Sequence, residues 1–300
     1  MTSRKSEVLT SLAAIVGGLL IGVPAHGSLQ TDLEVYVDFE GGFANKVAGG
    51  PATSLFTGSA RYSSGKVGSS AGDFRNTNGG GSVPNDWSVA IGTAGDSFNG
   101  ANASDGIYGT NNTAGFSFNL WMKTSNFNDR AVFGNKNWTS GSNQGWNLVT
   151  TGNKTINWTS PGGIRWDINY QPQGSNDGTW HMISAVFDRS TDTVHTYFDG
   201  VNLLNGTIRP AGGTLWSSSS FATLIGASGP GNYSGTAELD DVAIWSRALS
   251  ASEVTELYNS GSGLSLLSTS SSALPEPSTY VLASLGIIGL ALLGWRRRLD

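Results

Sequence analysis

The sequence predicts an all-β fold in which two antiparallel sheets pack face to face as a sandwich, with one short helix near the end of the domain. Alternating apolar and polar residues, the period of a half-buried strand, recur along the chain. The 300 residues include 42 glycines, and Asn, Ser and Thr are also abundant, so turns should be frequent and strands short. Cysteine is absent, so the core must be built by packing, for which 10 Trp, 12 Phe and 8 Tyr are present.

Residues 1–27 have the composition of a secretory signal peptide. Arg4 and Lys5 precede a mostly apolar stretch from Val8 to Val23. Small residues at Ala25 and Gly27 occupy the two positions that a signal peptidase accepts, so we place cleavage after Gly27. An uncleaved membrane anchor or a buried apolar helix is the alternative. On the first interpretation the mature domain lies outside the cytoplasm.

The strands are predicted from period-two patterns. Within Phe116–Lys123, the apolar residues at even numbers share one face and the other face carries Ser, Asn, Trp and Lys, so we expect one dry side. Asp199-Gly200 predicts a hairpin turn. Ser250 and Glu253 form a capping-box pair at the start of the single helix. The main predicted strands are Leu33–Phe39, Phe116–Lys123, Trp180–Arg189, Val194–Phe198 and Ala237–Trp245.

The charge of the mature chain excludes one class of partner. Without the leader and the last 26 residues, 12 of the 17 basic and 19 of the 22 acidic residues remain, which gives a net charge of about −7. Nucleic-acid binding requires a basic face that displaces counterions, so we expect no nucleic-acid partner. An acidic, weakly charged domain is compatible with calcium or with neutral sugars.

The C-terminal end predicts a membrane segment. A Ser/Thr-rich linker, 261–274, is followed by Pro275, Glu276 and Pro277, by an apolar run over 280–295, and by Arg296, Arg297 and Arg298. As a helix, the run would extend about 24 Å, slightly less than a bilayer core. The arginines should hold its end in the cytoplasm.

These terminal residues resemble the PEP-CTERM sorting signal, which covers 275–300 and is recognised by exosortase. The resemblance rests on the Pro-Glu-Pro triplet, the apolar run, the basic end and the terminal position together. It implies export in a Gram-negative bacterium, with exosortase and the export machinery as partners. The precursor would be anchored in the inner membrane through 280–295 and then reach the cell surface or the extracellular matrix. An ordinary tail anchor is the alternative.

The body of the chain resembles the laminin-G-like, concanavalin A-like lectin/glucanase jelly-roll family. The resemblance rests on six short motifs in the family's order, and the implied domain is 28–260. It implies a two-sheet sandwich in which the first strand lies beside the last. The motifs are Tyr62–Gly68, Phe116–Trp121, Asp177–His181, Tyr197–Gly200, Leu224–Gly226 and Leu239–Leu249.

The neighbouring first and last strands suggest a calcium site. Asp38 on the first strand could approach Asp240 or Asp241 on the last, and calcium prefers several oxygen ligands. Members of the family often carry such a calcium. Because successive side chains alternate between the faces of a strand, only one of Asp240 and Asp241 should join the site. The alternative is that these acids are turn or surface carboxylates.

An enzymatic function is not expected. A retaining glycosidase needs two carboxyl groups about 5 Å apart, which related glucanases carry on one strand as Glu-x-Asp-x-Glu. Glu238-Leu239-Asp240 begins this motif, but no second glutamate follows. Nor does a Gly-x-Ser-x-Gly elbow lie near a predicted helix, where Ser/His/Asp hydrolases carry it.

Two functions are therefore considered. The first is a non-catalytic carbohydrate-binding or adhesive module in extracellular polysaccharide, as in a biofilm matrix. The second is a structural matrix or protein-binding surface protein. An aromatic rim groove would favour the first, whereas a flat apolar patch or an uncovered edge strand would favour the second. Five aromatic residues are candidate sugar contacts, of which we expect two or fewer to be accessible: Trp138, Trp146, Trp158, Trp166 and Tyr170.

Overall fold

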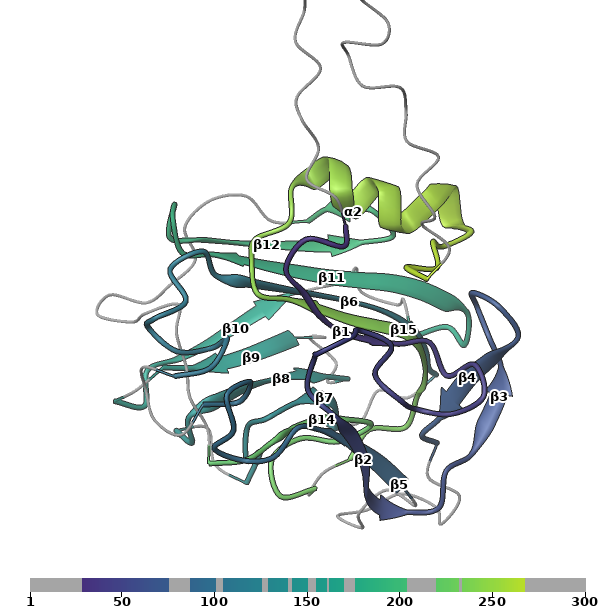
Figure 1. Ribbon diagram of the computed structural model, residues 1–300, viewed down its shortest axis with the longest axis horizontal. Coiled ribbons are helices and arrows are strands. Elements are labelled where there is room, and N and C mark those ends of the chain that lie inside the picture. The colour runs from purple at the N-terminus through teal and green to yellow at the C-terminus, as the bar shows by residue number, and fades with distance from the viewer. Residues whose placement is uncertain are drawn as a thin grey trace, which may run out of the picture.

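The described part of the protein folds as two antiparallel sheets packed face to face, with one short α-helix, as the sequence predicts (Figure 1). The computed structural model describes residues 29–75, 87–100, 105–125, 129–139, 142–150, 155–160, 162–169, 176–203, 220–231 and 234–267. The predicted signal peptide, the membrane segment 280–295 and the six sorting-signal residues lie outside these ranges. Within them, no helix combines the length and apolar character needed to cross a membrane.

The first sheet has eight strands. Along it lie β13 (Val201–Asn202), β12 (Thr193–Phe198), β11 (Trp180–Asp188), β6 (Phe116–Lys123), β15 (Glu238–Trp245), β4 (Ser70–Asp73) and β3 (Tyr62–Ser64), and β1 (Leu33–Val37) also pairs with β15.

The second sheet has seven strands. Its order is β10 (Arg165–Asn169), β9 (Thr155–Thr159), β8 (Gly145–Val149), β7 (Ala131–Gly134), β14 (Thr223–Ile225), β5 (Trp87–Ile91) and β2 (Thr53–Gly58).

Two predicted features of the strand pairing are confirmed: the first strand beside the last, and the hairpin turn at Asp199-Gly200. β1 runs antiparallel to β15, with Val37 opposite Val242, so the first strand lies beside the last. The hairpin between β12 and β13 turns at Asp199 and Gly200, whose φ angles are 50° and 76°. Positive φ at both central residues matches the right-handed twist of the two strands, and Asp-Gly is a favoured pair for it.

The space between the sheets is filled by aromatic and branched side chains. Phe116 stacks on Phe187 with ring centroids 4.5 Å apart, and Phe118 stacks on Trp146 at 5.1 Å. Such pairs contribute beyond the area that they bury. This core explains how the domain is held together without disulfides.

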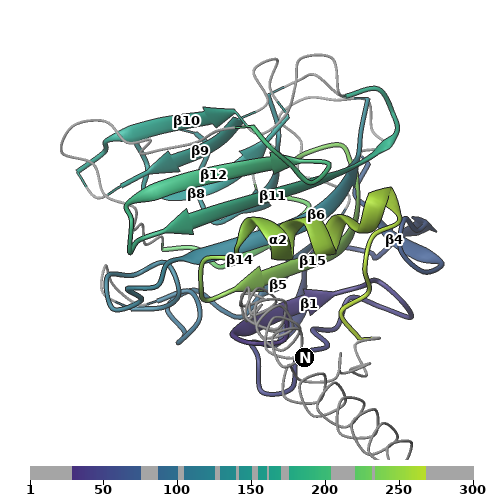
Figure 2. The same ribbon diagram turned by 90° about the horizontal axis from the view of Figure 1, so that it is seen from above.

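The first sheet is also buried on its outer face, which the sequence did not predict for β6. Helix α2 (Ala251–Tyr258), followed by a 3₁₀ turn (Asn259–Gly261), lies across this face beside β11, β6 and β15 (Figure 2). Trp121 on β6 stacks on Tyr258 of α2 and is 2% exposed. The expectation of one dry side was therefore too narrow, because α2 covers the second side. Its start is the predicted capping box of Ser250 and Glu253.

The two ends of the domain leave it at neighbouring positions. The Trp245 indole donates to the Leu29 carbonyl at 2.7 Å, and the Gln30 side chain donates to the Leu266 carbonyl at 2.8 Å. Leu29 and Leu266 both belong to the apolar cluster under α2. Packing thus begins directly after the predicted cleavage point and continues to Leu266, six residues past the predicted end of the domain at 260.

Candidate functional site

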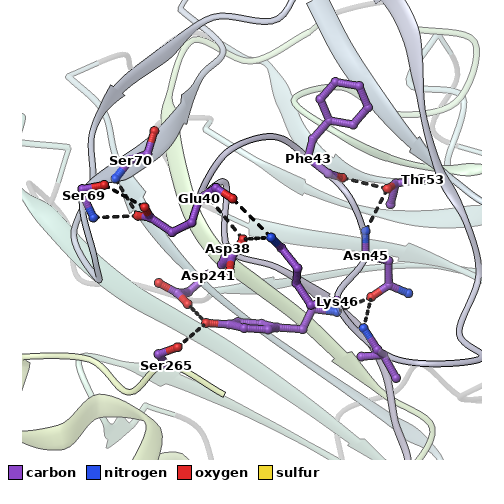
Figure 3. Close-up of polar contacts among 12 residues, drawn as sticks. Asp38, Glu40, Phe43, Asn45, Lys46, Thr53, Ser69, Ser70, Asp241 and Ser265 are labelled. Carbon is purple, nitrogen blue, oxygen red and sulfur yellow. Dashed lines mark hydrogen bonds and ion pairs between the residues drawn. The ribbon is translucent and has the colours of Figure 1, made fainter. Parts of the chain in front are cut away.

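The predicted acids lie where three strands meet in the first sheet. β4 pairs with β15 at Glu238 and Leu239, whereas β1 pairs with it from Val242 onward. Asp38 follows β1 directly, so it lies opposite the gap between these two pairings. Figure 3 shows Asp38 and Asp241 close together, with Glu40 beside them. We call Asp38, Glu40, Asp240 and Asp241 the acid cluster.

A β-bulge places both aspartates of β15 in this cluster. Between Asp240 and Ala243 the pairing of β15 with β6 slips by one residue, and Asp241 has a φ of 48°. A bulge adds one residue to one strand and interrupts the alternation of side chains. Asp240 contacts the backbone of Val67 and Asp241 contacts Tyr36, and both partners pack in the cluster under α2. Strict alternation is therefore interrupted at this point of β15, while the expectation that only one of the two aspartates binds a metal stays a prediction.

Asp240 is held by backbone donors. It is fully buried, and its Oδ2 accepts hydrogen bonds from the N–H groups of Lys66 at 2.7 Å and Val67 at 3.0 Å. Its Oδ1 accepts from the N–H of Asp241 at 3.0 Å. This carboxylate therefore fixes the turn before β4 against the bulge.

Asp241 has one engaged and one unengaged oxygen. Its Oδ1 accepts a hydrogen bond from the hydroxyl of Tyr36, which also lies 3.3 Å from the hydroxyl of Ser265. Its Oδ2 is buried and has no hydrogen-bond partner among the described residues. A buried carboxylate oxygen without a partner is costly when ionised, so Asp241 should carry a proton or meet a cation at this atom.

The other two acids have partners on nearby loops. Asp38 is 4% exposed, and its Oδ1 lies 3.2 Å from the ammonium of Lys46, which also donates to the carbonyl of Glu40. The Glu40 carboxylate accepts from the backbone and hydroxyl of Ser69 and from the backbone of Ser70. These hydrogen bonds, with the Ser69 hydroxyl first, lower the pKa of Glu40.

Burial and mutual repulsion make the two aspartates of β15 weak acids. Burial raises the pKa of Asp240 to about 7, against the three backbone hydrogen bonds that lower it. Burial, followed by the charge of Asp240, raises the pKa of Asp241 to about 8. Burial and the Asp241 charge likewise raise the pKa of the Tyr36 hydroxyl. Near neutral pH the pair therefore retains protons that exposed aspartates would have lost.

The fit of this cluster to calcium is partial. No group of three or more Asp, Glu, His or Cys residues in the described ranges has the spacing of a metal site. The unengaged Oδ2 of Asp241 is nevertheless the kind of hard oxygen ligand that calcium takes, and Asp38 already binds an ammonium cation. Asp240 is committed to three N–H donors, so it fits a supporting role better than that of a ligand.

Sequence reasoning missed Glu40, Tyr36 and Lys46. Glu40 lies two residues after Asp38, and this spacing was an available signal once a strand end was predicted there. Tyr36 has no such signal, because only the pairing of β1 with β15 and the bulge bring its hydroxyl to Asp241.

The aromatic candidates are mostly core residues, as expected. Trp146, Trp158 and Trp166 are each 4% exposed or less. Trp138 is partly buried, its indole donates to Asp129 at 2.9 Å, and Arg165 lies over its ring. Tyr170 lies outside the described residues. At most two of the five are accessible, which confirms the prediction.

Comparison with known proteins places the domain in a family. Residues 94–255 match the model of the concanavalin A-like lectin/glucanases superfamily, which is more than half of the chain. The chain belongs to this superfamily. Residues 273–298 match the PEP-CTERM protein-sorting motif, so the concanavalin A-like domain is followed by a sorting signal, as the sequence analysis predicted.

Solved structures share the fold of the concanavalin A-like domain at low sequence identity. Domain 4 of an extracellular arabinanase from Geobacillus stearothermophilus, solved with arabinotriose, is 17% identical with a TM-score of 0.51, and the match covers 75% of this chain and 97% of that one. The binding domain of paraclostridial mosquitocidal protein 1 is 17% identical with a TM-score of 0.55, covering 77% and 53%. Botulinum neurotoxin type C, whose cell entry depends on two ganglioside molecules, is 10% identical with a TM-score of 0.54, covering 77% and 52%. The chain thus spans about half the length of the toxin domains. No curated protein matches it in sequence.

Glu238, the first residue of the incomplete Glu-x-Asp-x-Glu motif, forms ion pairs in the concanavalin A-like domain. Glu238 is 3% exposed, and its Oε2 lies 3.0 Å from Lys123 and 3.7 Å from Arg75. A general acid in a glycosidase needs a raised pKa and a second carboxylate across the substrate. Glu238 instead lies between two cations, and the next acid on its face is the buried Asp240.

Proposed function

We propose that this chain is an exported surface or extracellular-matrix protein whose concanavalin A-like domain is a non-catalytic carbohydrate-binding or adhesive module. The observation that carries the proposal is the joining of this domain to a PEP-CTERM motif in one chain. The motif indicates sorting to the surface or outside through a membrane-anchored precursor. Exosortase is the proposed sorting enzyme, in a Gram-negative envelope, and the proposed ligand is extracellular polysaccharide of a biofilm matrix.

A binding function is favoured over catalysis by the site and by the neighbours. The ion pairs of Glu238 with Lys123 and Arg75 leave the strand that serves glucanases without an available acid/base pair. The arabinanase domain was solved with a bound oligosaccharide, and the two toxin structures concern binding or ganglioside interaction. These neighbours support carbohydrate as the ligand class without indicating which sugar.

Calcium is proposed as a structural cofactor of the acid cluster. Asp241 through Oδ2 and Asp38 are the proposed ligands, with Asp240 holding the bulge in position. A divalent cation would add to the single positive charge of Lys46 and would replace the protons on the two weak acids of β15. No step of ligand binding is assigned to it.

Glycan-array binding with the full-length chain, with and without a calcium chelator, tests the proposal. We expect binding to at least one oligosaccharide class and weaker binding with chelator. Unchanged binding with chelator would show that glycan binding does not require calcium, and the carbohydrate-binding proposal would stand. If no glycan on the array binds, the carbohydrate function is wrong.

A second function is supported by the edges of the two sheets. β2 ends the second sheet and β3 ends the first, and no described strand pairs with their outer edges. Leu55, Phe56 and Tyr62 on these strands are 43%, 45% and 42% exposed. Exposed apolar edge strands are sites for pairing with another chain. Sedimentation of wild type and a Leu55→Ser/Phe56→Ser double variant tests this: assembly that the variant lacks would favour a structural matrix protein.

A further inference from the structure

A cavity lies at the opposite end of β1 from the acid cluster. Its volume is about 450 Å³, a size that accommodates one or two sugar units. Glu34 on β1 and Ser246 after β15 form one side. The turn at 49–51 and the loops at 96–98, 106–107 and 111–112 form the rest.

The walls of this cavity are held rigidly. Asp96 fixes its loop by accepting hydrogen bonds from the N–H groups of Thr93 at 2.6 Å and Asn99 at 2.7 Å. Arg189, which directly follows β11, donates to the carbonyls of Tyr108 and Gly109, both at 2.7 Å, and so holds the chain between the lining segments 106–107 and 111–112. A site whose walls are already ordered loses little entropy when a ligand binds.

Several polar groups of the lining make no hydrogen bond within the part of the chain that the structure describes. The Ser97 hydroxyl, the Asn111 amide and the Asn112 Oδ1 make no hydrogen bond with any described residue. The Oε1 of Glu34 accepts from the Ser246 hydroxyl at 2.7 Å, while its Oε2 is similarly unengaged. Hydroxyl, amide and carboxylate groups around one cavity can donate to and accept from the hydroxyls of a sugar.

Charge and apolar surface narrow the ligand class. The lining includes the carboxylates of Glu34 and Asp96, and none of its residues is Lys, Arg or His. Such a cavity repels uronic acids, sulfates and phosphates. Pro51, which is partly buried, also lines it and offers an apolar surface to the C–H face of a sugar ring, whereas Phe98 and Ile107 are only 5% and 7% exposed.

We propose that this cavity, which we call the rim pocket, binds a neutral sugar unit of a polysaccharide. The proposal rests on the proposed carbohydrate-binding function and gives it a location and a charge class. Glu34 and Asn111 are the residues that hydrogen-bond the sugar hydroxyls, and Asp96 positions the loop.

Ligand-observed saturation-transfer NMR and calorimetric titration test the pocket, with the full-length chain in a detergent that has no sugar headgroup. Maltotriose, mannotriose, galactotriose and arabinotriose are the neutral probes, and trigalacturonate is the anionic probe. We expect at least one neutral probe to bind at least about tenfold more tightly than trigalacturonate. Glu34→Gln and Asn111→Ala should each weaken that binding by about tenfold. Glu256→Gln, an identical charge change on the exposed face of α2, is the matched control and should leave it unchanged.

Each other outcome overturns the pocket assignment. Neutral binding that is unchanged in both pocket variants places the site elsewhere and leaves the proposed function standing. Equal or tighter binding of trigalacturonate contradicts the charge argument. If none of the five probes binds at millimolar concentration, the pocket assignment is wrong. The broader glycan array then decides separately whether the domain binds carbohydrate at all.

Discussion

Replacing Asp241 by Asn should make the metal-free protein more stable at alkaline pH, although it removes a residue of the candidate site. Asn has the shape of a protonated aspartic acid and can still accept the Tyr36 hydroxyl through Oδ1. The positive φ of Asp241 is a conformation that Asn also tolerates. The variant therefore mimics the protonated site and avoids the cost of ionising it.

The size and sign of the effect follow from the pKa of Asp241. In the unfolded chain the carboxyl ionises near its ordinary value of 3.8, whereas in the folded protein it retains its proton up to about 8. The folded state therefore binds more protons between these values, and the stability of the wild type falls as pH rises through this window. The difference corresponds to roughly 6 kcal/mol as a ceiling, because each pKa unit is equivalent to about 1.4 kcal/mol. Since Asp240 and Asp241 titrate as a pair, we expect a gain of about 3 kcal/mol for the variant.

Urea denaturation followed by tryptophan fluorescence, with chelator present, measures this difference. Wild type and Asp241→Asn should be similar at about pH 4, near the pKa of the unfolded chain, and the variant should be more stable at about pH 9. Asp32→Asn is the matched control, because Asp32 also has a positive φ of 57° but is exposed. The reasoning fails if the variant is no more stable than wild type at the higher pH, or if wild type gains stability between the two.

Further predictions concern calcium, the His181 contacts and two structural positions. Calcium should stabilise wild type more at about pH 8 than at about pH 5, because it replaces protons on the weak acids, and Asp241→Asn should lose this effect in thermal denaturation. The hydrogen bond of His181 to Asp199, 2.7 Å long, and then the charges of Asp199 and Asp177 raise its pKa, so its stabilisation is complete below its ordinary pKa of 6.5 and is lost as pH rises through the raised value. His181→Gln should therefore cost about 1 kcal/mol at about pH 5 and little at about pH 9, measured by urea midpoints; an equal loss at both would contradict this. Ser250→Ala should cost about 1 kcal/mol through loss of the helix cap. Gly115→Ala should cost about 3 kcal/mol or more, because Gly115 has a φ of 93° and a Cβ there would overlap the Phe187 carbonyl. Urea denaturation measures both losses, and a wild-type midpoint for Ser250→Ala or for Gly115→Ala would refute the argument for that position.

The faces of the long strands could be predicted because alternation is a local property. Ile183, Ala185 and Phe187 enter the inter-sheet core, and Met182 and Val186 pack on the other side, as the spacing along β11 indicates. The neighbouring position of the first and last strands followed from the family resemblance. Burial of both faces of β6 could not be predicted in this way, since it depends on where α2 packs after the chain has folded.

The candidate site was predicted in part, for a similar reason. Asp38 and the two aspartates of β15 were identified from strand pairing. Their joint presence on one face depends on a single-residue slip against β6, which alternation cannot reveal. The rim pocket has no local pattern, because Glu34 on β1 and Asn111 in the connection between β5 and β6 are 77 residues apart in sequence and meet only in the folded domain.

β1 connects the two candidate sites without coupling them directly. Glu34 and Asp38 are four residues apart along an extended chain, which separates their Cα atoms by about 13 Å. The Glu34 side chain accepts a hydrogen bond from Ser246, whereas Asp38 pairs with Lys46, so the two carboxylates share no partner among the described residues. Substitutions that far apart without shared contacts have additive effects. With chelator present, sugar affinity should therefore respond to Glu34→Gln alone and alkaline stability to Asp241→Asn alone. A double variant should show both effects at their single-variant sizes, which would separate sugar binding by the pocket from stabilisation by the acid cluster.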